Sequence, residues 1–310
     1  MPFHAESTTD EVLEGVRLDG KHALVTGATG GLGIETARAL ASVGASVTIT
    51  GRGGDKIAAA LRTLREQVPG AQFDGEELEL GSLSNVAEAS KRIVASGRAI
   101  DRLILNAGVM MCPEGKTTDG FETQFGTNHL GHFAFTAGVL PALAPNARVV
   151  TLSSGAHLYG TCDLDDLQWQ ARDYDPRLAY AQSKTANLWF ASELQRRFGD
   201  RLLSLSVHPG VIQTDLTRHL PAAIVEGMAE NFASRGVSLK SVPQGAATSV
   251  WAATAEELAA HGGKYLLDCQ IAEPIPDPKA TGGYAPWAYE PASEARLWAE
   301  SEKLTGVSFG

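Results

Sequence analysis

The sequence predicts an α/β fold in which a doubly wound parallel sheet is covered by helices on both faces. Between residues 22 and 207, short apolar and β-branched runs alternate with longer Ala-rich stretches. This alternation is typical of parallel strands joined by right-handed crossover helices. A glycine-rich turn also follows the first apolar run, and ligands bind such sheets at the carboxyl ends of their strands.

The elements of this fold can be assigned in order along the chain. Strands are expected at 22–26, 46–50, 77–80, 103–105, 148–152 and 202–207. Helices are expected at 32–43, 55–67, 83–96 and 121–143 and around Tyr180, and Pro69-Gly70 closes the second of them. We interpret residues 1–18 as an N-terminal extension and residues 19–310 as one domain, a three-layer α/β/α sandwich.

Two long segments interrupt the alternation of strands and helices. Residues 155–175 include an Asp-rich loop, and residues 213–242 have weak strand character and are expected to form a helical flap. Both segments leave the sheet at the carboxyl ends of strands, so we expect both to be substrate loops.

Composition narrows the class of protein. The chain of 310 residues is 44% hydrophobic and 20% charged, which suits a globular domain with a substantial core. Its net charge of −10 argues against general binding to nucleic acid or an anionic membrane.

The cysteines and the apolar runs indicate the compartment. The three cysteines, Cys112, Cys162 and Cys269, are far apart in the sequence, which suits free thiols in a reducing compartment. The polar, acidic start is no signal peptide, and no apolar run has transmembrane length, so we expect a cytoplasmic protein without a membrane partner.

The glycine-rich turn Thr26-Gly-Ala-Thr-Gly-Gly-Leu-Gly33 is suited to hold a dinucleotide. Gly27, Gly31 and Gly33 have the spacing Gly-x-x-x-Gly-x-Gly between a strand and an amphipathic helix. Glycine permits a tight turn and the close approach of a pyrophosphate, and the helix start offers unpaired N–H groups. Glycines also make ordinary turns, but their position here favours a dinucleotide site.

The end of the second strand indicates which dinucleotide is bound. A carboxylate at this point would bind the adenosine ribose 2′-OH of NAD. The sequence instead reads Thr50-Gly-Arg-Gly-Gly54, in which Arg52 suits a 2′-phosphate and Gly51 leaves room for it. The alternative is that Arg52 is a solvated loop residue. We predict NADP(H) as the cofactor, with NAD(H) as the alternative.

Tyr180 and Lys184 are spaced four residues apart in a helical stretch. Such residues share one helix face, and a fixed cation lowers the pKa of a neighbouring phenol from its ordinary value near 10. One lysine does not account for a shift to neutral pH, and a cationic cofactor could add to it. Because this spacing also occurs by chance in many helices, the pair needs support from the rest of the chain.

That support comes from an ordered set of motifs. In chain order they are the glycine turn, Asn106-Ala-Gly108, Asn128, Ser154, the Tyr180/Lys184 pair and His208-Pro-Gly210. Together they resemble the short-chain dehydrogenase/reductase family, with its Rossmann-type fold, over about residues 18–305. The chain is most similar to the branch of retinol dehydrogenases and WW-domain oxidoreductases. The stretches that carry this similarity are Leu105-Asn-Ala-Gly-Val-Met, Thr127-Asn-His-Leu-Gly-His-Phe, Ser153-Ser-Gly-Ala-His and the tail Ala295-Arg-Leu-Trp-Ala-Glu-Ser-Glu-Lys-Leu-Thr-Gly.

The resemblance implies a role for each catalytic residue. Tyr180 is expected to be the general acid/base, and Lys184 to lower its pKa and bind the nicotinamide ribose. Ser154 is expected to hydrogen-bond the substrate oxygen, with Ser153 as its structural neighbour, and Asn128 to hold a water that links Lys184 to solvent. The expected cofactor-binding residues are Gly27, Thr29, Gly31, Leu32, Gly33, Arg52, Glu79, Leu80, Asn106, Ala107, Gly108, Tyr180, Lys184, Pro209, Gly210 and Thr214.

The chain departs from the family pattern at two places. Leu105 replaces the first of two usual asparagines, and Glu79-Leu80 replaces an Asp-Leu pair that contacts adenine, so that contact is in doubt. His129 and His132 could form a metal pair, but two histidines without a third ligand favour packing roles, and we predict no metal site.

The sequence therefore predicts an NADP(H)-dependent oxidoreductase that interconverts an alcohol and a ketone or aldehyde on a mostly apolar small molecule. The alternatives are an NAD-linked alcohol dehydrogenase of the same fold and a non-catalytic dinucleotide-sensing protein. The resemblance further implies a homodimer or homotetramer, with the Tyr180 helix in the interface.

Overall fold

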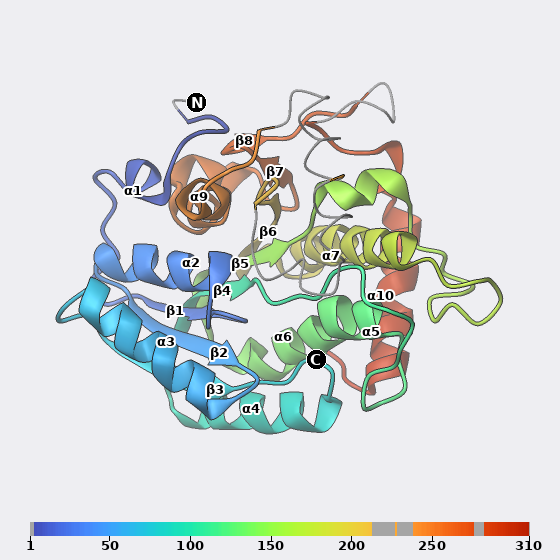
Figure 1. The fold of residues 1–310 in the computed structure, drawn as a ribbon, viewed down its shortest axis with the longest axis horizontal. Coiled ribbons are helices and arrows are strands. Elements are labelled where there is room, and N and C mark those ends of the chain that lie inside the picture. Colours follow the sequence, from blue (N-terminus) through green and yellow to red (C-terminus); the bar gives the residue numbers. More distant parts are fainter. Residues whose placement is uncertain (1–2, 213–226, 228–237, 276–281, 310) are drawn as a thin grey trace.

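The computed structural model describes residues 3–212, 227, 238–275 and 282–309. Within these residues, eight strands form one sheet in the order β3-β2-β1-β4-β5-β6-β7-β8 (Figure 1). The strands are β1 (His22–Val25), β2 (Ser46–Gly51), β3 (Phe73–Glu77), β4 (Ile100–Leu105), β5 (Leu143–Leu152), β6 (Leu202–His208), β7 (Tyr265–Leu267) and β8 (Gln270–Ile271). Neighbours from β3 to β7 pair in parallel, and only the short β8 runs antiparallel to its neighbour.

Helices cover both faces of this sheet, which confirms the predicted α/β class. The helices described are α1 (Thr9–Val12), α2 (Gly31–Ser42), α3 (Gly54–Gln67), α4 (Leu83–Ala95), α5 (Thr123–Phe125), α6 (Gly131–Val139), α7 (Pro176–Phe198), α9 (Val242–Thr254) and α10 (Pro291–Thr305). The buried residues of α2, α3 and α9 share one hydrophobic cluster on one face, while those of α4, α6 and α7 fill clusters on the other. The sheet is therefore the middle of three layers.

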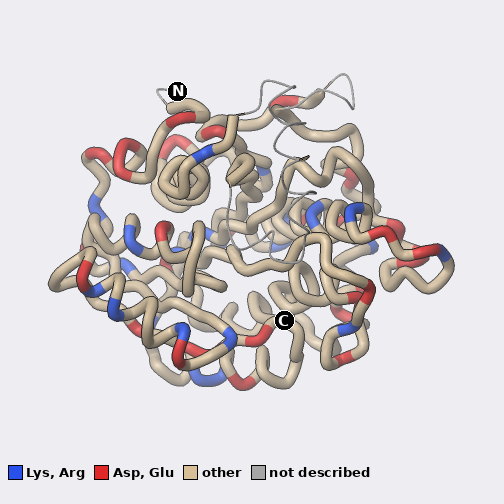
Figure 2. Tube along the Cα trace, in the orientation of Figure 1, with Lys and Arg blue, Asp and Glu red and all other residues tan. Residues whose placement is uncertain are grey.

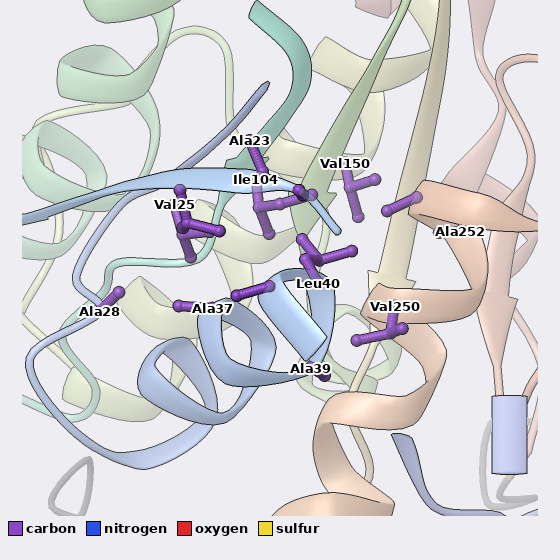
Figure 3. Packing of buried hydrophobic residues seen from close by; sticks show 14 of the residues in the cluster. Ala23, Val25, Ala28, Ala37, Ala39, Leu40, Ile104, Val150, Val250 and Ala252 are labelled. Carbon is purple, nitrogen blue, oxygen red and sulfur yellow. The ribbon is translucent and has the colours of Figure 1, made fainter. Parts of the chain in front are cut away.

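Figure 3 shows the core on the α2 and α9 face. Small and branched side chains from the two helices gather against the apolar residues of the central strands. The labelled residues are Ala23, Val25, Ala28, Ala37, Ala39, Leu40, Ile104, Val150, Val250 and Ala252. Because central parallel strands are buried on both faces, they read as continuous apolar runs, and this is why the sequence located β1, β4, β5 and β6.

Two of the predicted elements were placed wrongly. The third strand is Phe73–Glu77 rather than 77–80, because Leu78 and Leu80 bury their side chains from the loop that follows it. The expected helix at 121–143 is divided into α5, a π-helical turn Gly126–Leu130, α6 and a 3₁₀-helix Leu140–Ala142. Pro141 occupies the start of that 3₁₀-helix, and β5 begins at Leu143.

The N-terminal residues pack on the domain. Val12 and Leu13 are buried in the same cluster as α2 and α9. The Arg38 guanidinium on α2 donates to the hydroxyl of Thr9 at 3.2 Å and to the carboxylate of Asp10 at 2.7 Å. Charged residues of both signs are interspersed along the outer helices and loops (Figure 2). In the part of the chain that the structure describes, no helix is both long and apolar enough to cross a membrane.

Candidate active site

The candidate site lies at the carboxyl edge of the parallel sheet. The strands β1, β4, β5 and β6 all end at this edge. They lead into the glycine turn, Asn106-Ala-Gly108, Ser153-Ser154 and His208-Pro-Gly210, respectively. Motifs that are up to 180 residues apart in the sequence therefore converge, as expected of a parallel sheet whose ligand binds where the strand order reverses.

The glycine turn has the close contacts that only glycine allows. Gly27 has φ 64°, and a Cβ there would lie 2.8 Å from the Cα of Ala107. A Cβ at Gly33 would lie 2.6 Å from the carbonyl oxygen of Gly27. The turn leads into α2, whose first turn has neither a side-chain cap nor an acidic residue. The free N–H groups of this helix start fit the pyrophosphate of a dinucleotide.

Asn106 and Ala107 fasten the glycine turn to the end of β4. The Asn106 side-chain amide donates to the carbonyl oxygen of Thr26 at 2.8 Å. The backbone N–H of Ala107 donates to the Thr26 hydroxyl at 3.0 Å. Asn106 thus holds the cradle even though Leu105 replaces the usual first asparagine.

Arg52 and Glu79 lie together beyond the end of β2. Arg52 Nε is 3.9 Å from a carboxylate oxygen of Glu79, and 63% of the Arg52 side chain is exposed. The other carboxylate oxygen of Glu79 accepts the N–H of Gly81 at 3.0 Å. We expected Gly51 to leave room for a phosphate, but a Cβ there would lie 2.5 Å from Thr29 Cγ2. The space beside Gly51 is thus filled by the methyl group of the cradle residue Thr29.

The helix α7 brings Tyr180 and Lys184 together. Asp175 caps this helix by accepting the N–H groups of Arg177 and Leu178. Lys184 Nζ lies 5.6 Å from the centre of the Tyr180 ring and donates to the carbonyl oxygen of Leu152 at 3.0 Å. Tyr180 and Lys184 are only 5% and 4% exposed, so their mutual contact is shielded from water.

Burial determines the titration of this pair. It raises the pKa of Tyr180 to about 12, although a hydrogen bond with Ser154 opposes the shift. It also lowers the pKa of Lys184 to about 8. In the protein alone the pKa of Tyr180 therefore lies above its ordinary value, because desolvation of the buried phenolate is the largest contribution.

The structure distinguishes the two serines after β5. The Ser153 hydroxyl is buried and donates to the backbone carbonyl of Lys184 at 2.7 Å, which ties β5 to α7. Ser154 is partly exposed, accepts the N–H of Ala156 at 3.1 Å and is the neighbour that lowers the pKa of Tyr180 against the effect of burial. Only Ser154 is thus placed beside the phenol.

Asn128 is held inside a π-helical turn. The N–H of Gly131 bonds the carbonyl of Gly126 five residues back, so the helix is wider here than an α-helix. The Asn128 amide nitrogen donates to the carbonyl of Val109 at 2.9 Å, and its oxygen accepts the Val109 N–H at 2.8 Å. A Cβ at Gly108 would lie 3.2 Å from Asn128 Oδ1 and 3.7 Å from Lys184 Nζ, so Gly108 lies beside both groups.

His132 was not assigned a function from the sequence, yet it links two parts of the site. Its Nδ1 is 3.0 Å from the Asn128 carbonyl oxygen, and its Nε2 is 2.9 Å from the Thr26 hydroxyl. His129 instead contacts Ser301, 2.8 Å away. The two histidines therefore have different partners, and no group of three metal-ligating side chains occurs among the described residues.

Lys240 and Asp268 form a second contact that the sequence did not indicate. Lys240 Nζ is 2.5 Å from Asp268 Oδ1, and a Cβ at Gly210 would lie 2.7 Å from Lys240 Cδ. The lysine stem thus packs on the Pro209-Gly210 turn, where Gly210 has φ 91°. Thr214 and nearly all of the substrate loop at 213–242 lie outside the described residues.

Comparison with known proteins agrees with this geometry. The model of the short chain dehydrogenase family matches residues 21–225. The chain is 38% identical over 320 residues to the short-chain dehydrogenase/reductase prx1 of Penicillium roqueforti, covering 99% of this chain and 92% of that protein. It is 38% identical over 297 residues to retinol dehydrogenase 13 of Homo sapiens, covering 94% and 86%. The crystal structure of an uncharacterized protein from Mycobacterium paratuberculosis has a TM-score of 0.75 and 36% identity, covering 98% of this chain and 99% of that one.

The chain belongs to the short-chain dehydrogenase/reductase family. It is accordingly an oxidoreductase that uses an NAD(P) dinucleotide and acts on an alcohol or a carbonyl compound. The predicted similarity to retinol dehydrogenases is confirmed.

Proposed function

We propose that the protein is an NADP(H)-dependent oxidoreductase that interconverts a mostly apolar alcohol and its ketone or aldehyde, with Tyr180 as general acid/base. The observation that carries the proposal is the buried Tyr180, whose ring centre lies 5.6 Å from Lys184 Nζ and whose pKa is lowered by the neighbouring Ser154 against the effect of burial. The name of one relative, a retinol dehydrogenase, supports an apolar substrate.

In this proposal each residue of the site has one part in the reaction. Ser154 binds the substrate oxygen and holds it next to the Tyr180 hydroxyl. Tyr180 donates a proton to that oxygen during reduction and accepts one during oxidation. The dinucleotide, when bound, supplies or accepts the hydride. Lys184 contributes positive charge and the hydrogen bonds that orient the nicotinamide ribose, and Asn128 keeps the adjoining loop in place.

The acid/base role requires a Tyr180 pKa below the value of about 12 that the protein alone gives it. A positively charged oxidised nicotinamide would favour the phenolate, because an opposite charge nearby stabilises the charged form. We therefore expect the Tyr180 phenolate to form only when the cofactor is bound. In the free enzyme, the buried Tyr180 stays protonated.

The adenosine end of the site favours NADP(H) through Arg52. No acidic residue stands at the end of β2, and the exposed guanidinium is free to turn toward a 2′-phosphate. The cofactor residues at the cradle, from Gly27 to Gly33, serve either dinucleotide. NAD(H) remains the alternative because the carboxylate of Glu79 lies beside Arg52 and partly offsets the attraction of its positive charge for a phosphate.

The location and assembly of the enzyme remain predictions. We expect a cytoplasmic protein that forms a homodimer or homotetramer. Along α7, the residues from Ala179 to Ala191 are buried by their own chain, and α10 packs on this helix. An interface through the Tyr180 helix would have to displace α10, so we expect association through other surfaces.

Replacement of Tyr180 by phenylalanine tests the proposal. Tyr180→Phe removes the proton donor and keeps the ring, so the Kd for NADPH should stay within about twofold while kcat falls ~10²–10⁴-fold. Turnover is followed at the nicotinamide absorbance band with retinal and a panel of aromatic aldehydes and ketones.

The control is Thr63→Val, which removes a hydroxyl from the exposed side of α3, away from the candidate site. This variant should keep wild-type kinetics. If Tyr180→Phe retained a kcat near that of the wild type on a good substrate, the proposed mechanism would be wrong.

A further inference from the structure

His157 is a fully buried histidine that lies directly beside Ser154. It belongs to the 3₁₀-helix Gly155–Tyr159, which begins where β5 ends. Its Nδ1 is 2.7 Å from the carbonyl oxygen of Ser154, and its Nε2 is 3.3 Å from the backbone nitrogen of Ala285. The imidazole thus bridges the residue proposed to bind substrate and a segment 128 residues further along the chain.

The two partners determine which nitrogen carries the proton. A carbonyl oxygen can only accept a hydrogen bond and a backbone amide can only donate one. Nδ1 is therefore protonated and donates to Ser154, while Nε2 is unprotonated and accepts from Ala285. Burial lowers the pKa of His157 to about 4, so the neutral ring persists at physiological pH.

The surroundings leave the imidazole a single orientation. Its ring packs edge-on against Tyr265, with centroids 4.9 Å apart. The backbone carbonyl of His157 accepts the indole N–H of Trp287 at 2.9 Å. Backbone and side chain are thus both restrained, so Nδ1 can hold its partner in place.

The restraint on His157 acts on the candidate site through the backbone carbonyl of Ser154. This carbonyl accepts both the backbone N–H of His157, at 3.2 Å, and the imidazole Nδ1–H. Ser154 has an extended backbone, with φ −164° and ψ 157°, and its Oγ accepts the N–H of Ala156 at 3.1 Å. His157 thus restrains the backbone from which the Ser154 hydroxyl extends, and Ala156 restrains the hydroxyl oxygen.

We propose that His157 is a positioning residue, which orients Ser154 for the reaction through its Nδ1–H bond to the Ser154 carbonyl. The inference rests on the proposed function, in which Ser154 binds the substrate oxygen. A different role would be to anchor the C-terminal segment through Ala285. The two roles use different nitrogens of one ring, and this makes them separable.

Two amide substitutions separate the nitrogens. His157→Asn keeps an N–H donor at the position of Nδ1 and loses the acceptor toward Ala285. His157→Gln keeps an acceptor at the position of Nε2 and loses the donor toward Ser154. We expect His157→Asn to keep kcat within about threefold, and His157→Gln to lower kcat ~10–100-fold, because small misplacement of a reacting group is costly. The Kd for NADPH should change by less than about twofold in both.

The measurements are kcat and KM for the best carbonyl substrate of the panel, with NADPH binding and thermal unfolding of the same samples. Equal activities, or a more active His157→Gln, would show that the ring anchors the C-terminal segment and would overturn the inference. If both variants were unfolded, this too would show that the ring anchors the C-terminal segment, and the inference would be overturned. Selective ¹⁵N labelling of wild-type histidines gives an independent check, since finding the proton on Nε2 would also overturn it.

Measuring Tyr180→Phe alongside the two His157 variants separates a failure of this inference from a failure of the proposed function. If Tyr180→Phe is active, the proposed mechanism fails whatever His157 does. If Tyr180→Phe is inactive and the two His157 variants behave alike, only the positioning role fails.

Discussion

At the scale of single residues, the proposed preference for NADP(H) rests on a balance between two charges. Arg52 is the group that suits a 2′-phosphate, and Glu79 places a carboxylate oxygen 3.9 Å from its Nε. The Glu79 carboxylate is held by the N–H of Gly81, so it cannot turn away freely. Because exposed ion pairs contribute little energy, a phosphate can outcompete Glu79 for the guanidinium.

We expect Arg52→Asp to weaken NADPH binding by at least about tenfold and to change NADH binding far less. Glu79→Gln should tighten NADPH binding up to about fivefold, because it removes the competing carboxylate. Fluorescence titration of the reduced nicotinamide gives both Kd values. Arg62→Asp, the same charge change on the exposed face of α3, is the control. Equal effects of Arg52→Asp on the two cofactors would rule out the assignment of Arg52.

At the scale of elements, the site depends on the close approach of helix α6 to the loop after β3. A Cβ at Gly131 would lie 2.3 Å from the backbone carbonyl oxygen of Leu80. Leu80 is one of the predicted cofactor residues, and Gly131 closes the π-helical turn that contains Asn128. A single glycine thus lets the π-helical turn that contains Asn128 lie close to the loop that contains Leu80.

We expect Gly131→Ala to lower the free energy of unfolding by ~1–3 kcal/mol, although alanine favours helices, because the added methyl group meets rigid backbone. Urea denaturation measures this change. Gly53→Ala is the matched control, since nothing lies within 4 Å of a Cβ there. A Gly131→Ala protein as stable as the wild type would contradict the close approach of α6 and the loop.

At the scale of the whole molecule, buried histidines make stability depend on pH. Burial lowers the pKa of His22, His132 and His157 to about 4 and that of His129 and His208 to about 3. In the unfolded chain these groups bind protons near pH 6.5, so between pH 6.5 and 4 the unfolded state binds more protons than the folded state. Stability should therefore fall as pH falls through this window.

We expect the free energy of unfolding, measured by urea denaturation at pH 7, 6 and 5, to decrease steadily toward acid. Each fully shifted imidazole contributes about 1.4 kcal/mol per pH unit. His129→Phe, whose ring can join the surrounding phenylalanines, should reduce the slope by about one proton. A pH-independent stability would show that these rings are not buried in the neutral form.

Much of the fold and of the site could be predicted because the signals are local. The glycine turn, Arg52 and the Tyr180/Lys184 spacing each lie within a few residues of sequence, and their chemistry follows from residue type. The strands of the central sheet were located because burial on both faces leaves continuous apolar runs. The edge strand β3 was misplaced because it has little such signal, and β7 and β8 are too short to show any.

The contacts between distant segments could not be predicted in this way. Glu79 and Arg52, Lys240 and Asp268, and His157 and Ala285 are each brought together by the pairing and packing of separate elements. Nothing in the local pattern around any of these residues states which partner it has. Burial likewise reversed the expected shift of the Tyr180 pKa, because desolvation depends on the whole surrounding structure.

The sequence by itself determined the family and the candidate residues for dinucleotide binding and proton transfer, since these depend on residue types at short, ordered spacings. The tertiary structure alone decided how burial changes the acidity of the phenol, that Ser153 ties β5 to α7, and that His157 holds the carbonyl of Ser154. The physical reason is that hydrogen bonds and desolvation depend on distances in space, and packing of the elements creates those distances.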